Sequence, residues 1–196
     1  MQKISPVLRH LNIPNLITTL GMAFGIVAAY HLTLRNLRMA IVFLFIAGCM
    51  DLFDGFVASK LNQQSEFGRY LDTLVDFFTC VIMPIWMVFD LFERNYMLFA
   101  ALVFYCICGL WRLANYSLVG AGKTFTGLPV PASMGLVTMT VWFVTKYDLP
   151  VIIGIVAFFV VGALMVSGIK LPKYGLWQKA FGLLGLGFVI YVLLLG

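Results

Sequence analysis

The chain has 196 residues, of which 62% are hydrophobic and 11% are charged. A soluble domain averages about 45–50% apolar and about 25% charged residues, so this composition excludes an ordinary soluble domain and predicts a surface that faces lipid. The net charge of +5 does not indicate a nucleic-acid partner, because the basic residues are scattered over short connections, where they suit an anionic membrane surface.

Seven apolar segments approach or reach the length of about 20 residues that a membrane-spanning helix needs. Short polar connections separate them, and the segments lack the alternating pattern of the strands in a membrane barrel. The sequence therefore predicts an all-α, polytopic transmembrane helix bundle that occupies 1–196 as a single domain. The expected helices cover 15–34, 39–59, 70–92, 95–119, 129–146, 150–168 and 177–195.

The basic residues of the connections predict how these helices are oriented. If the N-terminus lies in the cytoplasm, the inner side holds eight basic residues and the outer side four, in agreement with the positive-inside rule. This orientation places the connections 60–69 and 120–128 on the cytoplasmic side. The inner residues are Lys3, Arg9, Lys60, Arg69, Lys123, Lys170, Lys173 and Lys179, and the outer ones are Arg35, Arg38, Arg94 and Lys146.

Four aspartates fall within 26 residues, at the edge of apolar helices or inside them: Asp51, Asp54, Asp72 and Asp76. An ionised carboxylate at such a place is costly, which makes intramembrane acids candidates for function. Asp51 and Asp54 are three residues apart and Asp72 and Asp76 four apart, so each pair lies on one face of its helix. Because a short connection returns the chain, the two pairs can face each other near the cytoplasmic side.

Four converging carboxylates repel one another unless cations compensate their charge. Ligands that are all oxygen select hard ions, such as Mg²⁺, Mn²⁺ or Ca²⁺, over zinc, and four negative charges could hold two of them. Gly55 and Gly68 flank the pairs, and Ala58 continues the small face, so a ligand can approach the backbone closely. This arrangement suits a metal-bound pyrophosphate. The alternative is that the aspartates cap helices or pair with Lys60 and Arg69.

The four cysteines do not suggest a second metal site. Cys49, Cys80, Cys106 and Cys108 all lie inside apolar segments, and Cys106 and Cys108 point to different sides of a helix. We interpret all four as small buried hydrophobic residues.

The stretch Asp51-Leu-Phe-Asp54-Gly55-Phe-Val-Ala58, followed by Gly68-Arg-Tyr-Leu-Asp72-Thr-Leu-Val-Asp76, resembles the signature of the CDP-alcohol phosphatidyltransferases. That signature is D-x-x-D-G-x-x-A-R, then G-x-x-x-D-x-x-x-D. All four aspartates, both glycines and the alanine stand at the spacing of the family. The arginine that follows the alanine in the family is Ser59 here, with Lys60 next.

Other stretches are similar to particular members of this family. Ile13-Pro14-Asn15-Leu-Ile-Thr18 resembles the start of their first helix. Arg112-Leu-Ala-Asn115 and Phe125-Thr-Gly127-Leu-Pro129-Val-Pro131-Ala132 resemble bacterial and archaeal phosphatidylserine synthases, as does the stretch 166–173. The stretch 78–84 is closer to bacterial phosphatidylcholine synthases, so serine and choline both stay open as the acceptor.

The resemblance implies a six-helix catalytic core, a homodimer in the inner membrane with its active site facing the cytoplasm, and a reaction that needs Mg²⁺ or Mn²⁺. A phosphatidyl group would pass from CDP-diacylglycerol to a small alcohol and release CMP. Asp51, Asp54, Asp72 and Asp76 would bind the two ions, and Asp76 would also act as general base. A membrane transporter with an acidic site is the alternative class, but the chain has no inverted repeat.

The remaining candidates would contact substrates. Residues expected to bind the nucleotide or the lipid donor are Asn15, Thr18, Gly55, Ala58, Ser59, Lys60, Gly68 and Arg69. Residues expected to bind the acceptor or a phosphate are Arg112, Lys123 and Lys170. Arg112 lies inside an apolar segment, where it could instead pair with an aspartate, and the two lysines could be ordinary cations of cytoplasmic connections.

Overall fold

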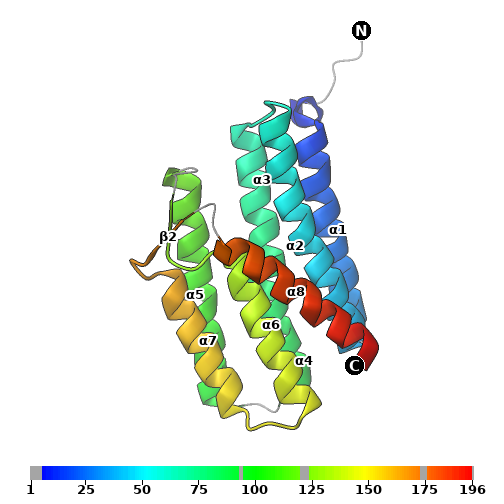
Figure 1. The fold of residues 1–196 in the computed structure, drawn as a ribbon, viewed down its shortest axis with the longest axis vertical. Coiled ribbons are helices and arrows are strands. Elements are labelled where there is room, and N and C mark those ends of the chain that lie inside the picture. The colour runs from blue at the N-terminus through cyan, green and yellow to red at the C-terminus, as the bar shows by residue number, and fades with distance from the viewer. Residues whose placement is uncertain (1–5, 93–94, 120–123, 173–175, 196) are drawn as a thin grey trace.

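The computed structural model describes residues 6–92, 95–119, 124–172 and 176–195 (Figure 1). Within these residues the chain is almost entirely helical, which confirms the predicted all-α bundle. A short 3₁₀-helix, η1 (Pro6–His10), precedes the first long helix. The α-helices are α1 (Ile13–Thr33), α2 (Leu37–Lys60), α3 (Glu66–Asp76), α4 (Met83–Leu91), α5 (Tyr96–Val119), α6 (Val130–Lys146), α7 (Ile152–Met165) and α8 (Leu176–Leu195).

Local side chains set where the first three α-helices begin. Asn12, Asn36 and Ser65 each accept a hydrogen bond from a backbone N–H of the first turn, at α1, α2 and α3 respectively. Such N-caps satisfy donors that the helix itself leaves free. The predicted 15–34 and 39–59 therefore differ from the observed helices by only a few residues.

The third helix of the bundle is not regular along its length. A π-helical segment, η2 (Phe77–Ile82), joins α3 to α4, and Glu66–Phe89 together form one continuous apolar helix of 24 residues. The sequence predicts this helix but not its π-helical segment.

Within the residues that the structure describes, four helices are long and apolar enough to cross a membrane: α1, α2, the continuous third helix and α5. The helices in the other predicted segments are shorter. α7 has 14 residues, or about 21 Å at about 1.5 Å per residue, which is less than the hydrocarbon thickness of about 30 Å. The chain is nevertheless an integral membrane protein, because four such apolar helices have no place in water.

A two-stranded antiparallel sheet, absent from the sequence-based prediction, joins the connections on either side of α6 and α7. Strand β1 (Thr124–Thr126) pairs with β2 (Lys170–Pro172), with Phe125 opposite Leu171. This sheet shortens the helical part of 150–168, since the chain leaves α7 at Met165 to reach β2.

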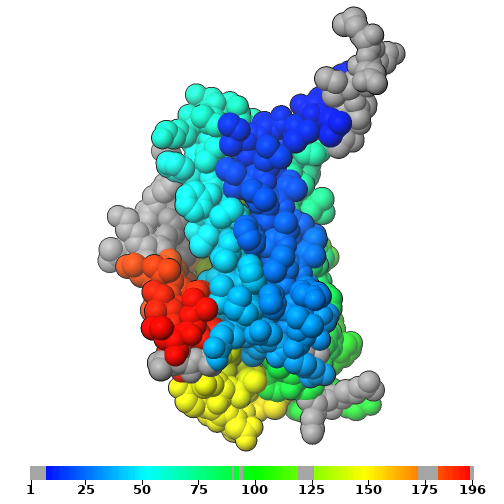
Figure 2. All heavy atoms as spheres, turned by 90° about the vertical axis from the view of Figure 1, so that its right-hand side faces the viewer, coloured from blue at the N-terminus to red at the C-terminus, as the bar shows by residue number. Residues whose placement is uncertain are grey.

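The helices pack in two main groups, α1 with α2 and α5 with α7, and the third helix and α6 lie between them (Figure 1). α8 runs obliquely across α2 and α6. Figure 2 looks onto α1 and α2, which lie side by side along that face. Many large apolar side chains on these outer faces are exposed, among them Leu16, Leu20 and Ile26 of α1, as expected of a surface that contacts lipid.

Candidate active site

The four aspartates come from α2 and from the part of the third helix that precedes its π-helical segment. Carboxylate oxygens of Asp51, Asp72 and Asp76 all lie within 4.8 Å of one another, and Asp54 lines the same recess. Asp54 and Asp76 are buried, while Asp51 and Asp72 are partly exposed. The two helices therefore bring together the two pairs of acids that the spacing predicts to face each other.

A neutral side chain from another helix holds Asp54 in place. The hydroxyl of Thr18, on α1, donates a hydrogen bond to a carboxylate oxygen of Asp54. Thr18 is only 4% exposed and also lies 3.2 Å from the carbonyl oxygen of Pro14. The first helix thus contributes to the acid cluster through a residue that orients an aspartate.

The donor set fits a hard divalent cation. The carboxyl groups of Asp51 and Asp72 are close enough to share a side-chain hydrogen bond, an approach that two ionised carboxylates make only when a proton or a cation lies between them. Every side chain of the cluster offers oxygen, which selects ions such as Mg²⁺, Mn²⁺ or Ca²⁺.

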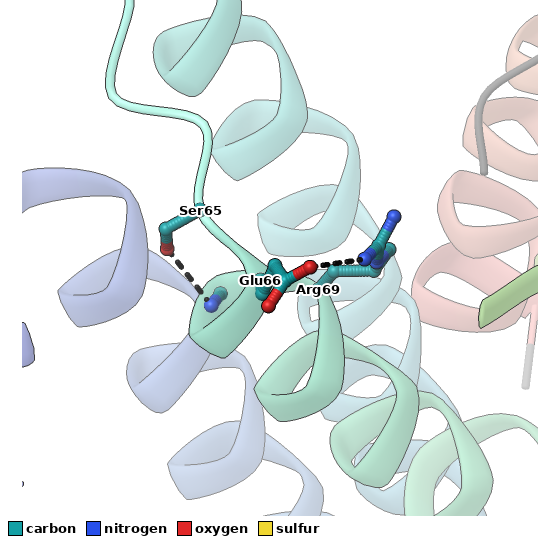
Figure 3. Close-up of polar contacts among 4 residues, drawn as sticks. Ser65, Glu66 and Arg69 are labelled. Atoms are coloured by element: carbon teal, nitrogen blue, oxygen red, sulfur yellow. Dashed lines mark hydrogen bonds and ion pairs between the residues drawn. The ribbon is translucent and has the colours of Figure 1, made fainter. Parts of the chain in front are cut away.

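The two basic residues that could have neutralised the aspartates are directed elsewhere. The Arg69 guanidinium lies 3.8 Å from the Glu66 carboxylate, on the exposed start of α3 that Ser65 caps (Figure 3). The ammonium of Lys60 lies 5.9 Å from the ring centroid of Phe56. The structure thus favours the metal-site interpretation of the aspartates over an ion-pair interpretation.

The two glycines of the motif have different surroundings. A methyl group added at Gly55 would meet nothing within 4 Å, so there is open space beside the backbone next to Asp54. A methyl group at Gly68 would lie 2.8 Å from Oδ1 of Asn15. The amide of Asn15 also donates to the carbonyl of His10, at 2.7 Å. Gly68 and Asn15 therefore belong to a tight contact between α1 and α3, whereas Gly55 leaves room for a ligand.

Arg112 lies on α5 and is 7% exposed. Its Nε donates to the carbonyl of Leu128 at 3.4 Å, and its guanidinium carbon lies 5.9 Å from the ring centroid of Tyr116. Tyr116 is within electrostatic range of Asp51, Asp72 and Asp76. Among the described residues, the partners of Arg112 are thus a carbonyl and an aromatic ring rather than an aspartate.

The Leu128 carbonyl lies in a turn that is held between the strand pair and the end of α7. The N–H of Gly127 donates to the Ile169 carbonyl at 2.7 Å, and that of Leu128 to the Leu164 carbonyl at 2.9 Å. Gly127 has φ +81°, and a side chain there would run into the Met165 carbonyl. The glycine is required by both its backbone conformation and this close approach.

The other expected substrate contacts differ in exposure and come from different elements. Ala58 is half-buried, and Ser59 and Lys60 are exposed at the end of α2. Lys170 is exposed on β2, while Lys123 lies outside the described residues.

Sequence reasoning missed several polar contacts around the acids. The hydroxyl groups of Thr73 and Ser117 lie 2.7 Å apart and tie α3 to α5. Thr79 lines the acid recess, and the Cys80 thiol contacts a carboxylate oxygen of Asp76 at 3.7 Å. Pro84, just below, was the one signal in the sequence that this helix would be irregular.

Comparison with known proteins gives the class to which this arrangement belongs. Residues 11–190 match the family model of the CDP-alcohol phosphatidyltransferases. The chain therefore belongs to this family, and it is a transferase of phospholipid synthesis with membrane helices. Members of the family depend in general on a metal, and the cluster of Asp51, Asp72 and Asp76 could hold one.

Three relatives cover most of the chain. The CDP-diacylglycerol–serine O-phosphatidyltransferase of Methanocaldococcus jannaschii is 32% identical over 164 residues, which are 84% of this chain and 75% of the relative. The protein of the same name from Bacillus subtilis is 32% identical over 166 residues, 83% of this chain and 90% of the relative. The archaetidylserine synthase of Methanothermobacter thermautotrophicus is 26% identical over 181 residues, 88% of this chain and 75% of the relative.

Proposed function

We propose that this protein transfers a phosphatidyl group from CDP-diacylglycerol to L-serine and releases CMP. The observation that carries the proposal is the set of three carboxylates within 4.8 Å of one another, placed by the motif of a family to which the chain belongs. The choice of serine is supported by the names of the relatives from Methanocaldococcus jannaschii and Bacillus subtilis.

The aspartates have separate tasks in this proposal. Asp51, Asp54 and Asp72 hold two divalent ions, Mg²⁺ or Mn²⁺, with Asp76 as a further ligand on the inner side of the cluster. Such ions, when bound, neutralise negative charge on the pyrophosphate. Asp76 accepts the proton of the serine hydroxyl while the oxygen of that hydroxyl attacks the phosphorus on the lipid side of the pyrophosphate. The bond from that phosphorus to the oxygen of CMP breaks, and CMP leaves with the electron pair.

The donor is proposed to lie along the small face of α2. Gly55 has open space beside it, and Ala58, Ser59 and Lys60 continue from it toward the end of the helix. Lys60 and Lys170 are exposed and can reach phosphate oxygens as point charges. Arg69 is proposed to act on the donor from the start of α3, while Asn15, Thr18 and Gly68 shape the pocket through the contacts described above.

The acceptor is proposed to bind between Arg112 and the acids. Serine carries a carboxylate, and a guanidinium is suited to bind it because its planar fork offers two parallel N–H donors. A choline site would instead need free aromatic faces around a quaternary ammonium. The Tyr116 ring already lies beside the guanidinium of Arg112, the Tyr105 ring is fully buried, and Trp111 is 72% exposed on the outside of α5. These surroundings favour serine over choline.

Orientation and assembly are part of the same proposal. The excess of basic residues at the end of the bundle that holds the acids supports an active site that faces the cytoplasm, in the inner membrane. A homodimer follows from the family resemblance. Reconstituted protein treated with a membrane-impermeant reagent for a single cysteine placed at Ser59 would test the first point, and light scattering in detergent the second.

The substrate assignment is tested with purified protein, CDP-diacylglycerol and one alcohol at a time. We expect CMP release and phosphatidylserine formation with L-serine, and no product after chelation with EDTA. D-serine, ethanolamine, choline and inositol serve as matched acceptors. Turnover that is unaffected by EDTA would contradict the metal site. Product from choline or inositol but none from serine would support phosphatidyl transfer as the reaction but refute serine as the acceptor.

A further inference from the structure

The π-helical segment η2 begins at Phe77, the residue after the proposed base Asp76. Short π-helical segments inside α-helices occur frequently at functional sites. The sequence gives its cause: Pro84 has no N–H to donate to the carbonyl of Cys80, four residues earlier, and its ring would clash with that carbonyl in a regular helix. The helix widens instead, and the N–H of Met83 donates to the Phe78 carbonyl, five residues back.

The Cys80 carbonyl finds its donor on another helix. The hydroxyl of Tyr105, on α5, donates to this carbonyl at 2.9 Å, and the Tyr105 side chain is fully buried. The Ser133 hydroxyl of α6 is 3.4 Å from the same phenol oxygen. In an apolar interior a carbonyl without a donor is costly, so a neighbouring helix that supplies one stabilises the widened turn.

The neighbouring helices α1 and α5 pack closely against the widened turn at two glycines. A methyl group added at Gly25 of α1 would lie 2.8 Å from the Thr79 side chain, and one added at Gly109 of α5 would lie 2.7 Å from the Val81 side chain. The segment is therefore held from both sides by backbone that only glycine allows so close.

The extra residue of the π turn decides which way Asp76 faces. Each residue of an α-helix advances the face by about 100°, so losing the extra residue would turn the two halves of the helix by about 100° relative to each other. At present Met83 and Met87 of α4 are fully buried in the core, and Asp76 of α3 lies in the acid recess. A regular helix could satisfy only one of these placements.

We infer that Tyr105 is a positioning residue for the reaction: by holding the Cys80 carbonyl it keeps the π turn, and thereby keeps Asp76 aimed at the acid cluster. The contact between the Cys80 thiol and the Asp76 carboxylate, at 3.7 Å, links the turn directly to the base. The inference rests on the proposed function, because it concerns the residue that takes the proton.

The test is a double-mutant cycle of Tyr105→Phe and Pro84→Ala, read out as kcat, KM and Mn²⁺ binding of folded protein. Tyr105→Phe removes one hydroxyl and should lower kcat by about 10-fold or more. Losses of this size are typical when a residue that orients a functional group through a hydrogen bond is replaced. The KM for each substrate and the affinity for Mn²⁺ should change far less than kcat. Tyr191→Phe, whose hydroxyl lies 2.7 Å from that of Tyr147 at the other end of the bundle, is the matched control and should keep wild-type kcat.

The cycle separates positioning from simple packing. Pro84→Ala restores an N–H that can reach the Cys80 carbonyl, so Tyr105→Phe should cost little further in that background. The inference is overturned if folded Tyr105→Phe keeps the wild-type kcat. It is also overturned if Tyr105→Phe lowers kcat by the same factor with Pro84 and with Pro84→Ala. If Tyr105→Phe alone does not fold, recovery of folded protein on adding Pro84→Ala supports it and no recovery overturns it. A wild-type protein without transfer to serine would instead overturn the proposed function.

Discussion

The active site as we propose it has two walls that arise in different ways. The acidic wall consists of Asp51, Asp54, Asp72 and Asp76 together with Thr18, and its acids come from two helices joined by one short connection. The basic wall is Arg112 together with the turn at Gly127 and Leu128 that its guanidinium contacts, and this turn lies beside a strand pair that joins residues more than 40 positions apart. The pairing of acids within each helix of the acidic wall therefore follows from local helix spacing, whereas the basic wall lies beside a long-range pairing of connections.

The largest expected effect comes from Asp76, the proposed general base of the acidic wall. Asp76→Asn should lower kcat by about 10²–10⁴-fold, because it removes a general base and keeps the shape of the side chain. It should still bind the CDP-lipid, since three other acids remain. Asp51→Asn should weaken binding itself. Calorimetry with the CDP-lipid in the presence of Mn²⁺ compares the two variants, and equal losses of binding would refute this division of tasks.

Thr18→Val tests the hydrogen bond that a neutral residue of the acidic wall donates to Asp54. Valine keeps the shape of threonine but cannot donate to Asp54, so the affinity for Mn²⁺ should fall by about 10–100-fold. Thr18→Ser, which keeps the hydroxyl, should stay close to wild type. Thr19→Val is the control, because that exposed hydroxyl donates to the Asn15 carbonyl of its own helix, at 2.7 Å, and has no partner on another helix among the described residues. Titration of bound Mn²⁺ by electron paramagnetic resonance measures all three, and an unchanged affinity in Thr18→Val would rule out the role.

Arg112→Ala tests the basic wall directly. A hydrogen bond to a charged group contributes about 1.5–3 kcal/mol, so the KM for serine should rise by about 10–100-fold. The KM for CDP-diacylglycerol should barely change. Arg112→Lys keeps the charge without the planar fork, so its KM for serine should lie between those of the wild type and Arg112→Ala. Steady-state kinetics with each substrate varied in turn gives both constants, and a shared rise in the two KM values would contradict an acceptor site.

Gly127→Ala tests the turn that holds the Leu128 carbonyl beside Arg112. Of these variants, it should change the KM for serine least. A residue with a side chain costs about 1–2 kcal/mol in the left-handed conformation, and here it would also displace the Met165 carbonyl. We expect a lower melting temperature and a KM for serine that rises less than in Arg112→Ala. Gly168→Ala is the control, since a methyl group there meets nothing within 4 Å. A raised KM for CDP-diacylglycerol in Gly127→Ala would place this turn on the donor side.

The two walls also differ in how far sequence predicts them. Runs of apolar residues predict the helices because each depends on neighbours in the chain, and the spacing of Asp51 with Asp54 and of Asp72 with Asp76 fixes a shared face. The bond between Thr18 and Asp54 and the contact of Gly68 with Asn15 depend on how α1 meets its neighbours, which no local pattern encodes. The strand pair joins two short connections without an alternating pattern, so nothing in 124–126 or 170–172 indicates it.

The strand pair has a consequence for the order in which the protein assembles. Its strands bracket α6 and α7, so β1 has no partner until the chain has been synthesised beyond Pro172. Chains emerge N-terminus first at about 5–20 residues per second, so the four acids and the Tyr105 that positions Asp76 are synthesised several seconds before Pro172 completes the strand pair beside the turn at Leu128. A chain that stopped after α7 would then carry the four acids, Arg112 and the bond from Leu128 to Leu164, but neither the Ile169 carbonyl that Gly127 bonds nor a strand beside it. We expect such a fragment, if it reaches the membrane, to bind Mn²⁺ and to discriminate poorly among alcohols, so selectivity for the acceptor is the last property this protein acquires during its synthesis.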